Sequence, residues 1–241
     1  MTSKIILQLT YDKIVLSQFP DAMNMRDASV QLLGRLKNEF GFKISDTLMA
    51  ESICADEINH RNKAYFNVLG EPFEMGGLAG IPFTGPVGLK AYAHHIPDQG
   101  FGLIFFGAHL GITTVGKFGE VCRRGRSQPG TSCGALMIVL NYFRSGEKMP
   151  VDYTNDPQIV QLFQWLEPYK HRILQSENPE ITITDCAYEI IRSKTFAAYD
   201  AARSEFHVRK TAFIGGITIN TEKGADDYFV LRDFEVMENQ G

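Results

Sequence analysis

The amino-acid sequence predicts a three-layer α/β domain built on a central, mostly parallel β-sheet. A compact apolar run at 102–107 lies between glycines, which is typical of a buried strand. Several longer segments place apolar residues at three- and four-residue steps, which is the helical period. The length of 241 residues suits one such domain, which we expect to span residues 1–241.

The first 45 residues are expected to form a helical N-terminal extension, and residues 46–241 a core that carries the chemistry. Apolar spacing predicts helices at 11–19 and 28–40. Gly41 is placed to end the second of these helices, because glycine readily adopts the left-handed conformation of a helix C-terminus.

Two loops and two short elements are expected in the middle of the chain. Residues 47–54 are predicted to form a strand that ends at Cys54, and residues 89–95 a short helix. Residues 70–88 are crowded with Gly and Pro and are predicted to form a long loop, whose aromatic and apolar side chains favour an ordered conformation. A Gly- and Arg-rich loop is expected at 111–130.

The C-terminal half is predicted to be helical before it ends in a β-hairpin. Thr131 and Ser132 can cap a helix that starts at Cys133, and Thr184 can cap a later one. A polar turn between two apolar runs predicts the hairpin. The expected elements are helices at 133–143, 157–173 and 185–206, and hairpin strands at 211–220 and 228–236 around the turn 221–227.

Composition and charge exclude several classes of partner. A formal net charge of −4 and a pI near 5.9 argue against nucleic acid, because that binding depends on neutralising phosphates. The basic run Arg123–Arg126 is too short to reverse this conclusion. No apolar run approaches the roughly 20 residues that span a bilayer, and the N-terminus has no signal-peptide cleavage site. We therefore expect a soluble protein that binds neither nucleic acid nor membrane.

Three potential metal ligands fall at comparable places in the predicted fold. Cys54 ends one strand, His109 follows the buried strand and Cys133 opens a helix. Side chains beyond the carboxyl ends of strands can converge at one edge of an open α/β sheet. A helix N-terminus also favours the thiolate form of a cysteine. The remaining cysteines, Cys122 and Cys186, are expected to be structural.

Two thiolates and one imidazole are a ligand set that suits Zn2+ in tetrahedral geometry. Three protein ligands leave the fourth position for water, whose pKa zinc lowers to about 7. Asp56 lies two residues after Cys54, close enough to accept a hydrogen bond from that water. Asp56 can also compete with the water as the fourth ligand, which would silence the site until its side chain moves away.

Five ordered segments of the chain carry a resemblance to a known family. They are Ser52–Asn59, Gly76–Phe83, Ala93–Asp98, Gly107–Gly111 and Cys133–Ala135. Together they resemble the limiting-CO2-inducible protein B/C family, also called the theta-class carbonic anhydrases, which is similar to the β-carbonic anhydrases.

The resemblance implies a β-carbonic-anhydrase-like fold with zinc on Cys54, His109 and Cys133. The implied activity is the reversible hydration of CO2 to bicarbonate by attack of a zinc-bound hydroxide, which Asp56 would orient and gate. It also implies a homodimer, and a place in the cytoplasm or the chloroplast stroma, between which the sequence does not decide.

One position departs from the β-class pattern. β-Carbonic anhydrases carry an arginine two residues after the aspartate, whereas this chain has Ile58 there. Another guanidinium must then hold Asp56 away from the metal, and the candidates are Arg61, Arg123 and Arg124. Arg124 is favoured among them, because the segment that contains it runs from one ligand to the next.

Regenerating the hydroxide requires a proton acceptor near neutral pH, and imidazole side chains titrate there. The candidates for a proton shuttle are His60, His94 and His95.

Three other interpretations of the same residues stay open. In the first, the three ligands close a structural site in a non-catalytic zinc-binding partner or regulator of a CO2-concentrating assembly. In the second, the protein is a zinc hydrolase of a small ester or amide, whose pocket should carry more polar groups. In the third, Cys54 and His109 form a metal-free thiol enzyme, which leaves Cys133 without a role.

Overall fold

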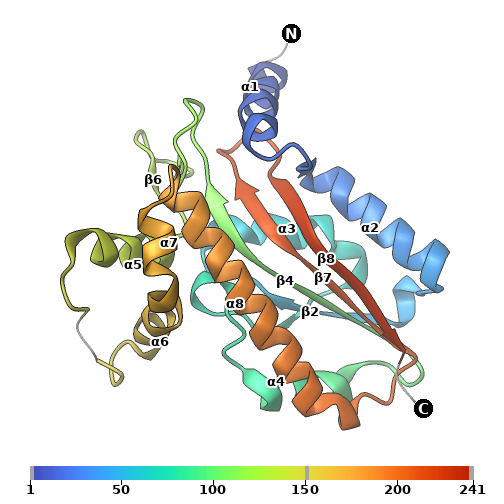
Figure 1. Cartoon of the computed structure of the whole chain (residues 1–241). Coiled ribbons are helices and arrows are strands. Elements are labelled where there is room, and N and C mark those ends of the chain that lie inside the picture. Colours follow the sequence, from blue (N-terminus) through green and yellow to red (C-terminus); the bar gives the residue numbers. More distant parts are fainter. Residues whose placement is uncertain (1–2, 150–151, 239–241) are drawn as a thin grey trace.

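A six-stranded β-sheet forms the centre of the fold (Figure 1). The computed structural model describes residues 3–149 and 152–238. The strand order is β1-β8-β7-β4-β2-β3, and β5 and β6 form a separate two-stranded ladder. The strands are β1 Met23–Asn24, β2 Thr47–Ser52, β3 Phe73–Glu74, β4 Phe101–Gly111, β5 Glu120–Val121, β6 Gly130–Thr131, β7 Lys210–Asn220 and β8 Tyr228–Glu238.

The sheet is mostly parallel, as predicted. Strands β3, β2, β4 and β7 run parallel, whereas β8 runs antiparallel to β7 and β1 pairs antiparallel with β8 at the edge. β7 and β8 are the predicted C-terminal hairpin. β4 and β7 pair in register over their whole lengths, from Phe101 opposite Lys210 to Gly111 opposite Asn220. Every residue of β4 is buried, which explains its continuous apolar sequence.

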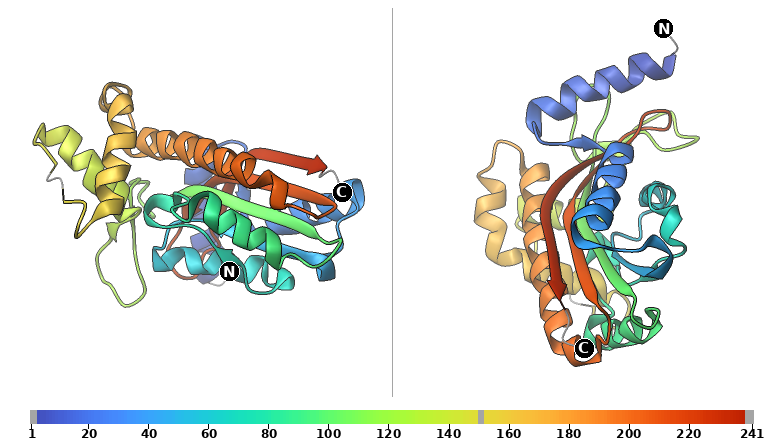
Figure 2. Two further views of the ribbon diagram at one scale, coloured as in Figure 1. Left: turned by 90° about the horizontal axis from the view of Figure 1, so that it is seen from below. Right: turned by 90° about the vertical axis from the view of Figure 1, so that its right-hand side faces the viewer.

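Helices cover both faces of the sheet and produce the three predicted layers (Figures 1 and 2). Alternate side chains of β4 point to opposite faces. Leu103 and Phe105 pack with residues of α2, and Ile104 and Phe106 pack with residues of α4 and α8. The helices are α1 Ser3–Gln18, α2 Met25–Phe40, α3 His60–Tyr65, α4 Gly85–His95, α5 Gly134–Ser145, α6 Pro157–Leu166, α7 Lys170–Leu174 and α8 Pro179–Ala202.

Several elements differ in extent from the prediction. The helix expected at 157–173 ends at Leu166, and after a short 3-10 turn that contains Pro168 the chain continues as α7, because proline cannot donate the next helical hydrogen bond. α8 begins at Pro179 rather than 185, so Thr184 lies inside the helix instead of capping it. β4 extends to Gly111, so His109 lies within the strand rather than beyond it.

The boundary expected at residue 45 does not divide the structure. Met23 pairs with Phe229, which joins β1 to the edge of the sheet. α2 buries Leu32 and Leu36 in the apolar layer on one face, and Gly41 ends it in the left-handed conformation, as predicted. That the whole chain forms one zinc-binding domain stays a prediction.

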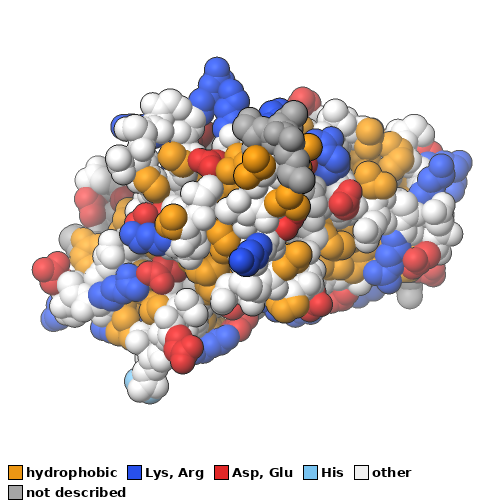
Figure 3. All heavy atoms as spheres, turned by 90° about the horizontal axis from the view of Figure 1, so that it is seen from above, with side chains coloured by type: hydrophobic (Ala, Val, Ile, Leu, Met, Phe, Trp, Pro, Cys, Tyr) orange, Lys and Arg blue, Asp and Glu red, His pale blue; other side chains and the backbone are white. Residues whose placement is uncertain are grey.

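α1 projects from the end of the sheet where β7 and β8 are joined (Figure 1). Its apolar side chains Ile5, Ile6, Leu9 and Leu16 are between 42% and 55% exposed. On the face seen from above, hydrophobic side chains lie among charges of both signs (Figure 3). Within the described residues, no helix has the length and apolar composition needed to cross a membrane.

The contact between β4 and β7 gives a direct test of this packing. A Cβ at Gly107 would lie 2.1 Å from the carbonyl oxygen of Gly216, and backbone cannot yield as a side chain can. Gly107→Ala should therefore lower the free energy of unfolding by about 1–3 kcal/mol or more in urea titrations. Gly34→Ala is the control, because Gly34 lies in α2 with nothing within 4 Å of its Cβ position. That change should raise stability by up to about 1 kcal/mol. Equal effects of the two substitutions would contradict the packing described.

Candidate metal centre

Three side chains with metal-binding atoms converge at the carboxyl end of the parallel strands. Cys54 follows β2, His109 lies near the end of β4 and Cys133 immediately precedes α5. Their ligand atoms lie within 4.8 Å of one another, and all three residues are buried. The structure therefore brings together the three residues that the sequence predicted as ligands.

The spacing of the two sulfurs fits a tetrahedral zinc ion. The Sγ atoms of Cys54 and Cys133 are 3.6 Å apart. Two sulfurs bound to one tetrahedral zinc at about 2.3 Å are separated by about 3.8 Å. The donor set of two thiols and one imidazole is also the chemistry that zinc prefers. The residues thus fit this metal in both distance and kind.

His109 presents one ring nitrogen to the cysteines and anchors the other. Its Nδ1 lies 2.7 Å from the Oδ1 atom of Asn220, which follows from the register of β4 with β7. Its Nε2 is buried without a hydrogen-bond partner among the described residues. A buried, unpaired ring nitrogen is costly unless something binds it. This free nitrogen is the strongest single sign that the pocket is built to hold a cation.

A glycine-rich segment at 76–80 holds the loop that carries Cys54. Backbone N–H of Ala55 donates to the carbonyl of Gly77 at 3.2 Å, and the Ser52 hydroxyl donates to the carbonyl of Gly80 at 2.9 Å. A Cβ at Gly80 would lie 2.3 Å from the carbonyl oxygen of Gly107, and its φ of +89° also favours glycine. The segment predicted as a loop at 70–88 is ordered, as expected, and it packs directly against the candidate metal centre, but from Gly85 onward it is the start of α4 rather than loop.

The two thiols and the imidazole of the pocket shift one another's pKa values. A hydrogen bond from Cys133 lowers the pKa of the Cys54 thiol to about 4, against the opposing effect of burial. The same hydrogen bond, together with burial, raises the pKa of Cys133. Burial disfavours protonated His109, but the neighbouring Cys54 thiolate outweighs it and raises the pKa of the imidazole. A divalent cation that replaces these protons would meet two sulfurs and a ring nitrogen.

Asp56 is held beside the pocket by Arg123. The guanidinium donates to both carboxylate oxygens, from Nη1 to Oδ1 at 2.7 Å and from Nη2 to Oδ2 at 2.8 Å. The pair is shielded, with side chains 23% and 10% exposed for Arg123 and Asp56. Burial alone would raise the pKa of Asp56, but Arg123 overcomes it and holds that pKa at about 2.

The favoured assignment of Arg124 as the partner of Asp56 is therefore wrong. The β5–β6 ladder sets the direction of the loop between them, so Arg123 reaches inward while Arg124 is exposed. Arg123 also donates to the carbonyl of Thr131 at 2.9 Å, which ties it to the segment that leads into Cys133. The local conformation of the loop turns the side chain of Arg123 inward and that of Arg124 outward. Residue spacing alone does not predict this difference.

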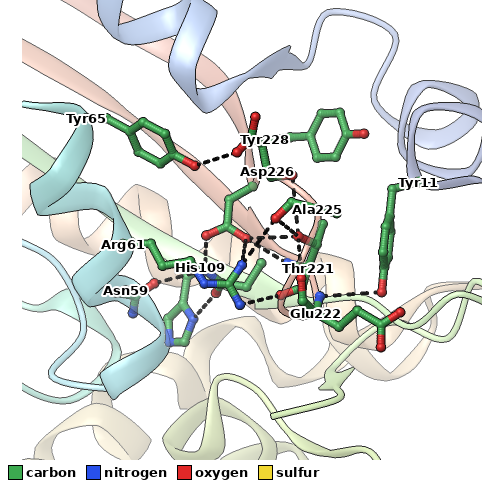
Figure 4. A network of polar contacts seen from close by, with 12 residues as sticks. Tyr11, Asn59, Arg61, Tyr65, His109, Thr221, Glu222, Ala225, Asp226 and Tyr228 are labelled. Carbon is green, nitrogen blue, oxygen red and sulfur yellow. Dashed lines mark hydrogen bonds and ion pairs between the residues drawn. The ribbon is translucent and has the colours of Figure 1, made fainter. Parts of the chain in front are cut away.

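Arg61 does not contact Asp56 either. Its guanidinium lies in the β7–β8 turn, where it pairs with Asp227 at 3.3 Å and donates to the carbonyl of Thr221 at 3.0 Å (Figure 4). Asp227 in turn contacts Asn220, the residue that anchors His109. Arg61 is thus connected to the centre through other side chains and not by direct contact with the ligands.

His94 and His95 are far from the candidate centre, so neither fits the expected role of proton shuttle. They end α4, just before the start of β4 at Phe101, whereas His109 lies near the end of that strand. Eight residues of extended chain span about 26 Å. His94 pairs with Glu205 at 3.3 Å, and His95 packs against the ring of Phe73.

Comparisons with known proteins place this chain among characterised folds. The family model described as limiting CO2-inducible proteins B/C beta carbonic anhydrases matches residues 23–238. The chain belongs to this family. The crystal structure of PtLCIB4, a homologue of the limiting CO2-inducible protein LCIB, shares 32% identity over 94% of this chain and 95% of its own, with a TM-score of 0.86. No curated protein sequence matched the chain.

The similarity to LCIB itself is more distant. Its crystal structure shares 20% identity over 93% of this chain and 94% of its own, with a TM-score of 0.69, which shows a common fold. The matched range, residues 23–238, spans Cys54, Asp56, His109, Arg123 and Cys133. In this member of the limiting CO2-inducible protein B/C family, the arginine beside the aspartate comes from the loop between two candidate ligands, and Ile58 is buried instead.

The sequence did not predict the roles of two residues of the centre, Asn220 and Arg123. Asn220 ends the strand that neighbours β4, and a polar residue at a strand end beside His109 was the available signal. Which residue of β7 lies beside His109 depends on strand register, and register was not predicted. Arg123 was a candidate, but nothing in the sequence ranked it above its neighbour.

The ion pair between Arg123 and Asp56 predicts a pH-dependent stability. Because the folded-state pKa of Asp56 is about 2 rather than 3.8, the pair stabilises the fold above pH 4 and loses this contribution as pH falls towards 2. Arg123→Gln should lower the free energy of unfolding by about 1–3 kcal/mol at pH 7, and the difference from the wild type should shrink at pH 3. Urea titrations at both pH values measure this. The control is Arg124→Gln, which should behave as the wild type; a pH-independent loss in Arg123→Gln would contradict the role of the pair.

Proposed function

We propose that this protein catalyses the reversible hydration of CO2 to bicarbonate with Zn2+ held by Cys54, His109 and Cys133. The observation that carries the proposal is the free, buried Nε2 atom of His109 beside two sulfurs 3.6 Å apart. Membership of a family described as carbonic anhydrases supports the choice of reaction. Zinc bound there supplies Lewis acidity, which lowers the pKa of a water ligand to about 7.

Asp56 and Arg123 have complementary roles in this proposal. Arg123 occupies both oxygens of the Asp56 carboxylate, which keeps the carboxylate from serving as a fourth ligand. The fourth position is then open for water and substrate, as catalytic zinc sites require. With its pKa held at about 2, Asp56 remains an acceptor at neutral pH and can orient the attacking oxygen by a hydrogen bond.

Proton transfer to solvent is assigned in this proposal to His60. This residue is exposed at the start of α3, four residues after Asp56 in the sequence. An exposed imidazole can pass protons between a site and solvent, which suits a proton shuttle.

We further propose that the protein is a homodimer that acts in CO2 concentration in the cytoplasm or the chloroplast stroma. The exposed apolar side chains Ile5, Ile6, Leu9 and Leu16 of α1 support self-association, because no element among residues 3–149 and 152–238 covers them.

A non-catalytic zinc-binding partner or regulator is the second candidate. The burial of all three ligands favours it, since structural zinc sites are closed to solvent. In that case Asp56 or another group would complete the coordination. The two candidates differ in whether zinc-loaded protein turns over CO2.

Zinc content and CO2 hydration, measured on the same preparation, test the proposal. We expect one zinc per chain by metal analysis and CO2 hydration in stopped-flow pH-change assays. Cys54→Ser should lose most of the zinc and nearly all of the hydration, because it removes a ligand. Cys122→Ser should keep both, since the half-buried Cys122 thiol lies outside the ligand set. Removal of zinc by a chelator should abolish hydration, and its addition should restore it.

The remaining outcomes each decide between the candidates. Stoichiometric zinc without CO2 hydration would favour the regulator. Absence of zinc from protein with intact thiols would overturn both.

A further inference from the structure

A chain of buried polar side chains leads from His109 into the β7–β8 turn (Figure 4). Asn220 and Asp227 are fully buried, and His109 is 2% exposed. Buried polar groups cost free energy unless each is hydrogen-bonded, and a connected, fully bonded chain of them holds its members in fixed positions.

The amide of Asn220 is oriented by its own neighbours. Its Nδ2 faces two acceptors, the Oδ1 atom of Asn59 at 3.3 Å and the Oδ2 atom of Asp227 at 3.4 Å. An amide nitrogen is only a donor and an amide oxygen only an acceptor. With the nitrogen so placed, Oδ1 is the atom that faces His109. The Nδ1 atom of His109 must then carry the hydrogen, which leaves the lone pair on Nε2.

Asp227 is held in place from three directions. Arg61 pairs with it at 3.3 Å, and the backbone N–H of Thr221 donates to it at 2.8 Å. The third contact is the one to Asn220. Burial raises the pKa of Asp227, and the Arg61 guanidinium opposes this effect. A fully buried carboxylate beside a half-buried guanidinium thus forms a fixed support behind the Asn220 amide.

The same amide also connects two of the proposed ligands. Asn59 accepts from Asn220 and donates through Nδ2 to the carbonyl oxygen of Cys54 at 3.2 Å. The ring of His109 and the backbone of Cys54 are therefore tied to each other through two asparagine side chains. A shift of Asn220 would move both ligands relative to Cys133.

We propose that Asn220, supported by Asp227 and Arg61, is a positioning residue that fixes the tautomer and direction of the His109 ring for metal binding. This inference rests on the proposed metal site. Groups that hydrogen-bond to a ligating histidine fix its orientation and strengthen it as a ligand, and their loss typically weakens metal binding by about 10–100-fold.

The test is zinc affinity by chelator competition, together with the visible absorption spectrum of the Co2+-substituted protein. Asn220→Leu keeps the side-chain volume but removes the acceptor, and Asp227→Asn removes the charge that supports the amide. We expect each to weaken zinc binding by about 10–100-fold and to alter the Co2+ spectrum, which reports ligand geometry. If Asn220→Leu fails to fold, as judged by circular dichroism, Asp227→Asn carries the test.

The matched control is Asp226→Asn. This neighbouring carboxylate lies in the same turn but contacts Tyr65 and Arg26 instead of Asn220. It should bind zinc within about twofold of the wild type and leave the Co2+ spectrum unchanged, since its loss is that of a partly exposed surface pair. Equal weakening in Asp226→Asn and Asp227→Asn would overturn the inference, because both would then act through the fold of the turn.

Two further results would separate the positioning role of Asn220 from the proposed activity. Wild-type zinc affinity and an unchanged Co2+ spectrum in Asn220→Leu would also overturn the inference. A wild-type protein that binds zinc but does not hydrate CO2 would defeat the proposed activity, whereas weakened binding in Asn220→Leu and Asp227→Asn would still support the positioning role.

Discussion

The in-register parallel pairing of β2, β4 and β7 is the constraint on which the candidate centre depends. Ser52 lies opposite Phe106 and Gly111 opposite Asn220, so Cys54, His109 and Asn220 all fall at one edge of the sheet. Strand register moves in whole residues, and a slip by one would turn His109 to the other face. The side chains of β4 pack on both faces of the sheet, and this packing fixes the register. The register in turn fixes which residues meet in the pocket.

Close backbone contacts keep that register rigid near the ligands. Gly107 lies close to the carbonyl of Gly216 in the neighbouring strand. Gly80, in the glycine-rich segment, lies close to the carbonyl of Gly107. Side chains at these positions would push β4 away from β7 and from the glycine-rich segment that holds the Cys54 loop. The glycines thus act in packing, and they let a loop far along the chain close over the end of β2.

Charges and hydrogen bonds orient the polar side chains that packing brings together at the pocket. The half-buried pair of Asp56 and Arg123 holds a charged carboxylate next to the pocket, while the Asn220 amide directs the other ring nitrogen of His109 into it. The unpartnered Nε2 atom of His109 and the two sulfurs thus form a group that favours a cation, with a carboxylate beside it. A structure that leaves such a preference inside its core is stabilised when a cation binds, since binding to the folded state alone adds to its stability.

The sequence by itself determined the buried parallel strand, the C-terminal hairpin and the three convergent candidate ligands, because apolar periodicity and ligand chemistry are properties of short segments. It did not determine which arginine reaches Asp56, that His94 and His95 lie at the far end of the sheet, or that Asn220 stands beside His109. Those relations were decided only by the tertiary structure. They depend on strand register, loop direction and helix placement, which arise from contacts between residues tens to more than a hundred positions apart.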